Sequence, residues 1–293
     1  MRVGLIGIGV MGWPMAANIL KGGHDLTVFD LDRDALERFT REVGGKAADS
    51  IGQIAGSEVV VTMLPTSKHV RQALAEAEGG AFLKAAQPGL IVIDMSSSEP
   101  GDTQALGPVL AERGVVLIDA PVSGARPRAI TGTLALMIGG EDEAAIAKAT
   151  PILQCMGDRL FRTGPLGSGH AMKCLNNYVA AAGMAAACEA VLIGRRFGLD
   201  GETMADILNV STGKNFATEH ILKQHILSGS FSGGFTLGLM TKDVAIAANL
   251  GEQMGIDAPV SRLVRERFIQ ARDEVGAGRD NSAAILAWDK DLG

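Results

Sequence analysis

One short stretch of the sequence places a lysine and an amide where they could act on the same molecule. Lys173 and Asn177 are four residues apart, so on a helix they share one face, and Asn176 occupies the neighbouring i+3 position. A buried lysine beside another cation has its ammonium form disfavoured and can then exchange protons as a general acid and base. The competing interpretation of Lys173 is an ordinary surface lysine on a helix.

A second stretch has the residue types of a phosphate-binding turn. The apolar run over residues 3–8 enters the spacing Gly7-x-Gly9-x-x-Gly12, and residues 15–20 continue as an apolar-faced helix. Gly7 permits a tight turn, Gly9 lets a pyrophosphate approach the backbone, and Gly12 allows close contact between helix and strand. The helix N-terminus supplies free amides and positive dipole for the phosphates. This context predicts a dinucleotide site rather than a plain glycine turn, with these cofactor-facing residues: Gly7, Gly9, Val10, Met11 and Gly12.

The next predicted strand, residues 26–29, ends in Asp30, at about the spacing expected of an acid that binds the adenosine ribose. Its carboxylate can accept hydrogen bonds from both ribose hydroxyls and would repel a 2′-phosphate, which favours NAD over NADP. Two alternatives stay open. Arg33 could reach a 2′-phosphate, or Asp30 could simply cap the turn that follows it.

A third stretch suits a small anion. A strand that ends in Ser123-Gly124 presents a hydroxyl and accessible amides to a carboxylate at the carboxyl edge of a sheet, although a plain turn has the same residues. Arg126 and Arg128 follow, and either could add a donor fork for a second anionic group such as a carboxylate or a sulfonate. A solvated loop arginine is the competing interpretation.

The elements that must position these residues change character along the chain. In the first half, short runs rich in Val and Ile alternate with helical segments, at residues 3–8, 26–29, 59–64, 90–94 and 115–118. This alternation predicts a parallel, doubly wound sheet, which the runs at 134–138 and 159–161 could extend. From Ser168 onward nearly everything is of helical period. We therefore expect a Rossmann-type α/β domain over residues 1–164 and an all-α domain over 165–293 that begins with the Lys173 helix, with the active site in the cleft between them.

Composition narrows the classes of partner. The net charge is −6 without a run of Lys or Arg, which argues against nucleic acid and against a membrane surface. Three cysteines without metal or redox spacing fit reduced thiols, and the N-terminus lacks the sections of a secretion signal, so we expect a cytoplasmic protein. The apolar stretch 179–193 is short and carries Glu189, which favours a buried helix over a membrane span. His220 and His225 do not share a helical face, so we predict no metal site.

Taken together, these motifs resemble those of the β-hydroxyacid dehydrogenases, the group that contains 3-hydroxyisobutyrate dehydrogenase and tartronate semialdehyde reductase. The resemblance covers essentially the whole chain. It comprises the opening glycine motif, the stretch 119–124, a G-x-G-x-x-x-K-x-x-x-N stretch at 167–177, and a late motif at Lys242-Asp243-Val244. The chain departs from the family after Gly124, where more glycine is usual and Ala125-Arg126-Pro127-Arg128 stands instead.

The resemblance implies an NAD-dependent oxidoreductase that interconverts a small 3-hydroxy acid and its semialdehyde. Lys173 would be catalytic, Ser123 and Gly124 would hold the substrate carboxylate, and Asn177 would help to bind substrate. The remaining cofactor-binding residues by this resemblance are Met63, Leu64, Pro65, Ser97, Phe235 and Lys242.

Other functions stay open on the sequence. They are a reductase of tartronate semialdehyde or of a sulfonated or dicarboxylic semialdehyde, a relative of 6-phosphogluconate dehydrogenase with a phosphorylated substrate, an imine reductase, and a non-catalytic nucleotide-binding module of the same fold. Imine reductases typically lack the lysine, so Lys173 argues against that one. The Ala-rich segment 180–190 would allow close helix contacts, and we expect a homodimer or homotetramer.

Overall fold

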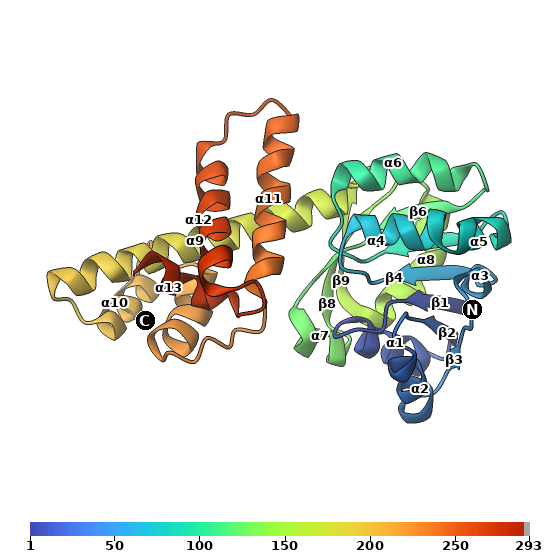
Figure 1. Ribbon diagram of the computed structural model, residues 1–293, viewed down its shortest axis with the longest axis horizontal. Coiled ribbons are helices and arrows are strands. Elements are labelled where there is room, and N and C mark those ends of the chain that lie inside the picture. The colour runs from blue at the N-terminus through green and yellow to red at the C-terminus, as the bar shows by residue number, and fades with distance from the viewer. Residues whose placement is uncertain (290–293) are drawn as a thin grey trace. The chain divides into compact units, whose positions relative to one another are not determined.

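The computed structural model describes residues 1–289, and its chain forms two compact units that divide between Lys173 and Cys174. The first unit is built on one sheet and the second is helical (Figure 1). The last strand of the first unit ends at Gly164, and the helix that carries Lys173 begins at Ser168.

The sheet of the first unit follows the classical nucleotide-binding order. Its strands are β1 (Arg2–Ile6), β2 (Asp25–Phe29), β3 (Lys46–Ala47), β4 (Val59–Thr62), β5 (Ile91–Asp94), β6 (Val116–Asp119), β7 (Val122–Ser123), β8 (Leu134–Gly139) and β9 (Gly157–Gly164). They are ordered β3-β2-β1-β4-β5-β6-β8-β7, with β9 paired to β8. The strands from β3 to β6 are parallel, whereas β8 runs antiparallel to β6 and β7. The predicted doubly wound α/β sheet is confirmed.

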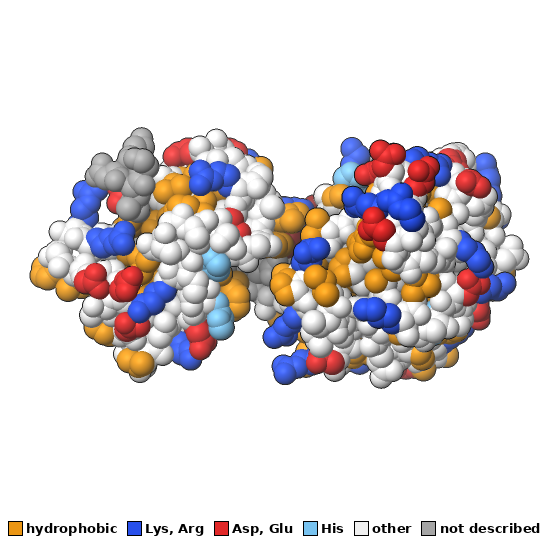
Figure 2. Space-filling view, turned by 90° about the horizontal axis from the view of Figure 1, so that it is seen from below, with side chains coloured by type: hydrophobic (Ala, Val, Ile, Leu, Met, Phe, Trp, Pro, Cys, Tyr) orange, Lys and Arg blue, Asp and Glu red, His pale blue; other side chains and the backbone are white. Residues whose placement is uncertain are grey.

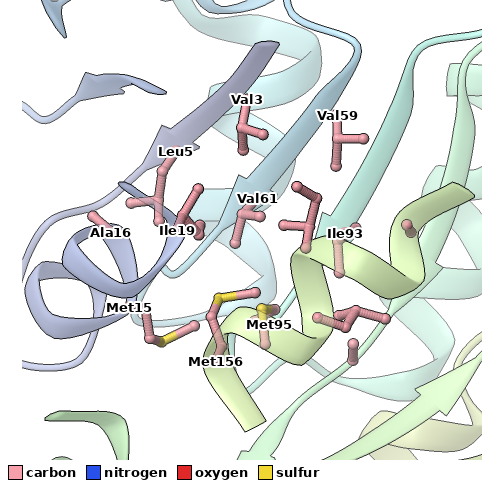
Figure 3. Close-up of a cluster of buried hydrophobic side chains, with 14 of the residues drawn as sticks. Val3, Leu5, Met15, Ala16, Ile19, Val59, Val61, Ile93, Met95 and Met156 are labelled. Carbon is pink, nitrogen blue, oxygen red and sulfur yellow. The ribbon is translucent and has the colours of Figure 1, made fainter. Parts of the chain in front are cut away.

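Helices cover both faces of this sheet because its strands are apolar on both sides. They are α1 (Gly12–Lys21), α2 (Arg33–Glu42), α3 (Ile51–Ile54), α4 (Ser67–Arg71), the π-helical η1 (Gln72–Glu76), α5 (Ala77–Ala85), α6 (Pro100–Ala111), α7 (Ala125–Thr131) and α8 (Glu143–Met156). Alternate strand residues face opposite ways. Val59 and Val61 pack with Met15 of α1 and Met156 of α8 on one face (Figure 3), and Val60 belongs to the core on the other.

The second unit consists of helices packed around their own core. The elements are α9 (Ser168–Phe197) from Cys174 onward, α10 (Gly201–Val210), the π-helical η2 (Thr218–Leu227), α11 (Leu237–Gln253), α12 (Pro259–Val275), the 3-10 helix η3 (Asn281–Ala284) and α13 (Ile285–Trp288). Buried residues from several of these helices make the core, among them Cys188, Leu222, Val244 and Phe268. The predicted all-α second domain is confirmed. Among the described helices α9 alone has the length and hydropathy to cross a membrane, and 44% of its most apolar window is buried inside the structure.

Candidate active site

Two glycines of the opening turn are required by the packing of the chain itself. Gly7 has φ +97°, and a Cβ there would overlap the carbonyl oxygen of Met63 at the end of β4. A Cβ on Gly12 would overlap the carbonyl oxygen of Gly7. The start of α1 therefore lies directly against the turn that leaves β1, as the sequence pattern predicts for a helix that begins in contact with the strand end.

The third glycine of the turn is not required by the packing. A Cβ on Gly9 would meet no atom of the chain within 4 Å, and the φ angle of Gly9 is not in the left-handed region. No side chain caps the first turn of α1, the Trp13 amide donates to the Gly9 carbonyl at 3.0 Å, and Pro14 has no amide hydrogen, so within residues 1–289 the Gly12 amide is the donor of this turn without a chain acceptor. A pyrophosphate needs room and an available donor at the helix start, so the turn fits a bound dinucleotide.

Asp30 is held against this turn from the end of β2. Its Oδ2 accepts a hydrogen bond from the Ile8 amide at 2.8 Å, and its Oδ1 accepts one from the Asp32 amide at 3.0 Å. The second contact means that Asp30 also caps the following turn, as one of the alternatives supposed. The guanidinium of Arg33 donates to the carbonyls of Ala48 and Asp49, at 3.4 and 2.8 Å. Arg33 is therefore bound to the backbone that follows β3.

The other residues expected to line the cofactor in the first unit follow β4 and β5, the strands next to β1 on its other side. The Met63 amide donates to the Ile6 carbonyl at 2.9 Å, which ties the end of β4 to the end of β1. The Leu64 amide donates to the Ser96 hydroxyl at 2.9 Å, one residue before Ser97. The structure therefore brings the glycine turn, Asp30 and the segments at 63–65 and 97 to one edge of the sheet.

The start of α9 is fixed to the same edge by a residue whose role the sequence analysis missed. Asp119, the last residue of β6, is fully buried and accepts hydrogen bonds from the backbone amides of Gly167 at 2.7 Å and His170 at 2.9 Å. A carboxylate at a helix N-terminus is stabilised by the helix dipole as well as by these bonds. Lys173, which is half-buried, lies one turn farther along α9. The sequence offered one signal for this role, because Asp119 directly follows the strand predicted at residues 115–118.

The expected substrate loop has an unusual backbone. Ser123 ends β7, Gly124 has φ +133°, and Ala125 has φ +53°, a left-handed conformation that is uncommon outside glycine. The aliphatic stem of Arg128 lies against Gly124, since a Cβ on that glycine would meet Cβ, Cγ and Cδ of the arginine. Ser123 and Gly124 are half-buried, and Arg126 and Arg128 are exposed.

In the second unit, Asn177 is oriented by two neighbours. Its Nδ2 donates to Oδ2 of Asp243 on α11 at 2.6 Å, and its Oδ1 accepts from Nδ2 of Asn176 at 3.1 Å. Asp243 is buried and lies 3.5 Å from the ammonium of Lys242. Phe235 precedes α11, and its carbonyl accepts from the Asn281 amide at 2.8 Å. Three expected site residues, Asn177, Phe235 and Lys242, thus belong to this unit.

The cysteines stand outside this chemistry. Burial raises the pKa of the Cys174 and Cys188 thiols to about 12, with the nearby carboxylates of Asp243 and Glu189 as lesser causes. Burial also raises the pKa of Cys155. These thiols are protonated near neutral pH and are poor nucleophiles. No cluster of three metal-ligating side chains occurs within residues 1–289.

Comparison with known proteins finds matches over nearly the whole chain. The family model for the NAD binding domain of 6-phosphogluconate dehydrogenase matches residues 2–164, and the model described as NAD-binding of NADP-dependent 3-hydroxyisobutyrate dehydrogenase matches residues 167–288. The chain is 35% identical to the 2-(hydroxymethyl)glutarate dehydrogenase of Eubacterium barkeri, covering 100% of this chain and 96% of the relative. It is 34% identical to the 3-sulfolactaldehyde reductase of Escherichia coli K12, covering 97% and 94%. A solved structure of Mycobacterium tuberculosis 3-hydroxyisobutyrate dehydrogenase with L-serine superposes with a TM-score of 0.89 at 30% identity, covering 98% of each chain.

Proposed function

Since the chain belongs to the β-hydroxyacid dehydrogenase family of NAD-dependent oxidoreductases, we propose that Lys173 is the residue that moves the proton in its reaction. The reaction interconverts a small 3-hydroxy acid and its semialdehyde. One observation carries the assignment of Lys173. Asp119 anchors the start of α9 at the carboxyl edge of the sheet, and this is the edge that holds the glycine turn and Asp30. Lys173, one turn along, is the ionisable residue that follows that anchor in the helix.

The proposed roles follow from what each side chain can donate or accept. Bound NAD would supply the acceptor and donor of the hydride that leaves or reaches the substrate carbon. In oxidation, Nζ of Lys173 as the free amine accepts the hydroxyl proton, and in reduction its ammonium donates a proton to the carbonyl oxygen. The Ser123 hydroxyl and the Gly124 amide bind the substrate carboxylate. Asn177 donates to the substrate from its amide, and Asp243 holds that amide in orientation.

The cofactor-binding roles of the opening turn and Asp30 are part of the same proposal. The room at Gly9 and the Gly12 amide at the start of α1 suit the pyrophosphate, and the position of Asp30 beside the turn suits the ribose hydroxyls. Met63, Leu64, Pro65 and Ser97 are proposed to line the cofactor from the neighbouring strands, and Phe235 and Lys242 to lie near the nicotinamide.

A substrate with a second anionic group is the second candidate, and one contact favours it. Arg128 packs its stem on Gly124, inside the proposed carboxylate loop, and within residues 1–289 neither Arg126 nor Arg128 has an acidic partner for its guanidinium. Guanidinium groups bind carboxylates and sulfonates through paired donors. The dicarboxylic substrate named for the Eubacterium barkeri relative and the sulfonated one named for the Escherichia coli relative have such groups.

The test is nicotinamide absorbance with the purified chain, NAD or NADP, and a panel of hydroxy acids. The panel holds 3-hydroxyisobutyrate, glycerate, threonate, 2-(hydroxymethyl)glutarate, dihydroxypropanesulfonate and 6-phosphogluconate. NAD-dependent turnover that is lost in Lys173→Ala and kept in Lys148→Ala, an exposed lysine of α8, supports the proposal. Full turnover in Lys173→Ala would remove Lys173 from the mechanism. Tight NAD binding without turnover of any compound would favour the non-catalytic module.

We also propose that the protein is a cytoplasmic homodimer or homotetramer. The support is in the second unit, where apolar side chains reach the surface on the face seen in Figure 2. Phe197 at the end of α9 and Val210 at the end of α10 are exposed, and a partner surface would remove such side chains from water. Light scattering coupled to size exclusion distinguishes a monomer, a dimer and a tetramer directly.

A further inference from the structure

Two aspartates end neighbouring strands of the sheet, and both are buried. Asp94 closes β5 and Asp119 closes β6, and the two are register partners, so their side chains leave the sheet on the same face. Their exposed fractions are 1% and 0%. Asp94 accepts hydrogen bonds from the hydroxyls of Thr62 at 2.8 Å and Ser98 at 2.7 Å. Two adjacent buried carboxylates repel each other unless a cation lies between them.

His170, in the first turn of α9, provides an imidazole between these two carboxylates. Its Nε2 lies 3.7 Å from Oδ2 of Asp94, and its Nδ1 lies 3.7 Å from Oδ2 of Asp119. The ring is fully buried, and Nδ1 is 2.9 Å from the hydroxyl oxygen of Thr103. Because that hydroxyl donates to the Glu99 carbonyl at 3.2 Å, it accepts from Nδ1, which therefore carries a hydrogen. Nε2 is buried and has no hydrogen-bond partner within the described part of the chain.

We propose that His170 is a positioning residue which, as an imidazolium, bridges Asp94 and Asp119 and so holds the first turn of α9 and Lys173 in place. A hydrogen on Nε2 points toward the Asp94 carboxylate and gives the orphaned nitrogen an ionic partner. The positive ring also offsets the charge of one of the two carboxylates. The inference rests on the proposed role of Lys173, which is three residues farther along the helix.

The contacts around the His170 ring explain why removing the ring would displace the first turn of α9 and not only leave an empty cavity. Asp119 holds α9 through the amides of Gly167 and His170, so any shift of its carboxylate is passed to the first helical turn. Without the imidazolium, Asp94 and Asp119 repel each other across the strand ends. A displacement of about 1 Å at a catalytic group can cost roughly 100-fold in rate.

The experiment compares the full chain with His170→Gln and with His220→Gln, an exposed histidine of η2. Hydrogen–deuterium exchange reports the amides of residues 165–173, and steady-state kinetics report kcat and KM. We expect faster exchange in that peptide and a kcat lower by about 10- to 100-fold in His170→Gln alone. In ¹⁵N spectra of the wild type, both ring nitrogens of His170 should be protonated.

A pair of milder variants at Thr103 tests the same proposal if His170→Gln does not fold. Thr103→Val removes the hydroxyl that the ring contacts, and Thr103→Ser keeps it, so kcat should fall in the first and recover in the second. Unchanged exchange at 165–173, an unprotonated Nε2, or unchanged kcat in a variant with faster exchange would each overturn the inference. If the wild type turns over no hydroxy acid, the proposed function fails, and exchange together with the ring signals still decides whether His170 bridges the carboxylates.

Discussion

Replacing Gly9 by alanine tests the dinucleotide turn without disturbing the fold. A Cβ at this position meets no chain atom within 4 Å, and Gly9 is exposed with an ordinary φ, so the free energy of unfolding should change by no more than about 0.5 kcal/mol. The same methyl group occupies the space proposed for the pyrophosphate. Losing one hydrogen bond to a charged phosphate costs about 1.5–3 kcal/mol, which corresponds to a roughly 10- to 150-fold rise in the Kd for NADH.

The assay is a fluorescence titration of NADH together with thermal unfolding of the same samples. Gly12→Ala is the matched control, because its Cβ would overlap the Gly7 carbonyl oxygen and should lower stability by about 1–3 kcal/mol or more. The two variants should therefore separate, with Gly9→Ala losing affinity and Gly12→Ala losing stability. NADH binding by Gly9→Ala at wild-type affinity would refute the reasoning, as would an equal loss of stability in both.

Three further experiments, two substitutions and one chemical modification, test other parts of the protein. Lys173→Ala should lower kcat by about 10²- to 10⁴-fold while the Kd for NADH stays the same, measured by steady-state kinetics and titration. Asp30→Asn should raise the Kd for NADH by about tenfold and narrow its advantage over NADPH, since the neutral amide no longer repels a 2′-phosphate. Because burial raises the pKa of Cys174 and Cys188 to about 12, a thiol reagent at pH 8 should modify neither in the native chain, and any native reaction should map to the half-buried Cys155 by mass spectrometry.

Much of the fold was predictable because local patterns dominate it. The apolar runs at 26–29 and 59–64 correspond to β2 and β4, and they pair in parallel with β1 as their spacing indicates. The strand predicted to end at Ser123-Gly124 corresponds to the short β7, but its antiparallel pairing with β8 was not predicted. The π-helical η1 has no distinctive signal in a segment of helical period, whereas the kink at Glu78, where φ is +51°, is followed by Gly79-Gly80, a pair typical of helix breaks.

The candidate site was predictable where a motif is contiguous and not where contacts are distant in sequence. The glycine turn and the Lys173 helix are each read from a dozen adjacent residues or so. The bond between Asn177 and Asp243 joins residues 66 apart, and the bond between Asp119 and the Gly167 amide joins residues 48 apart. Such pairings depend on which strands and helices become neighbours, and no local spacing encodes that.

The close packing around the Asp119 carboxylate also limits which substitutions this site can accept during evolution. A Cβ on Gly139 would overlap one carboxylate oxygen, and a Cβ on Gly169 would overlap the Met137 carbonyl and approach the other oxygen. Gly139 could become alanine only after the aspartate had moved or been replaced, and replacing the aspartate first would release the start of α9. Gly169 is restricted further, because the Met137 backbone carbonyl would also have to move. New substrate preferences should be easier to acquire at residues 125–128 in α7, where the side chains are exposed.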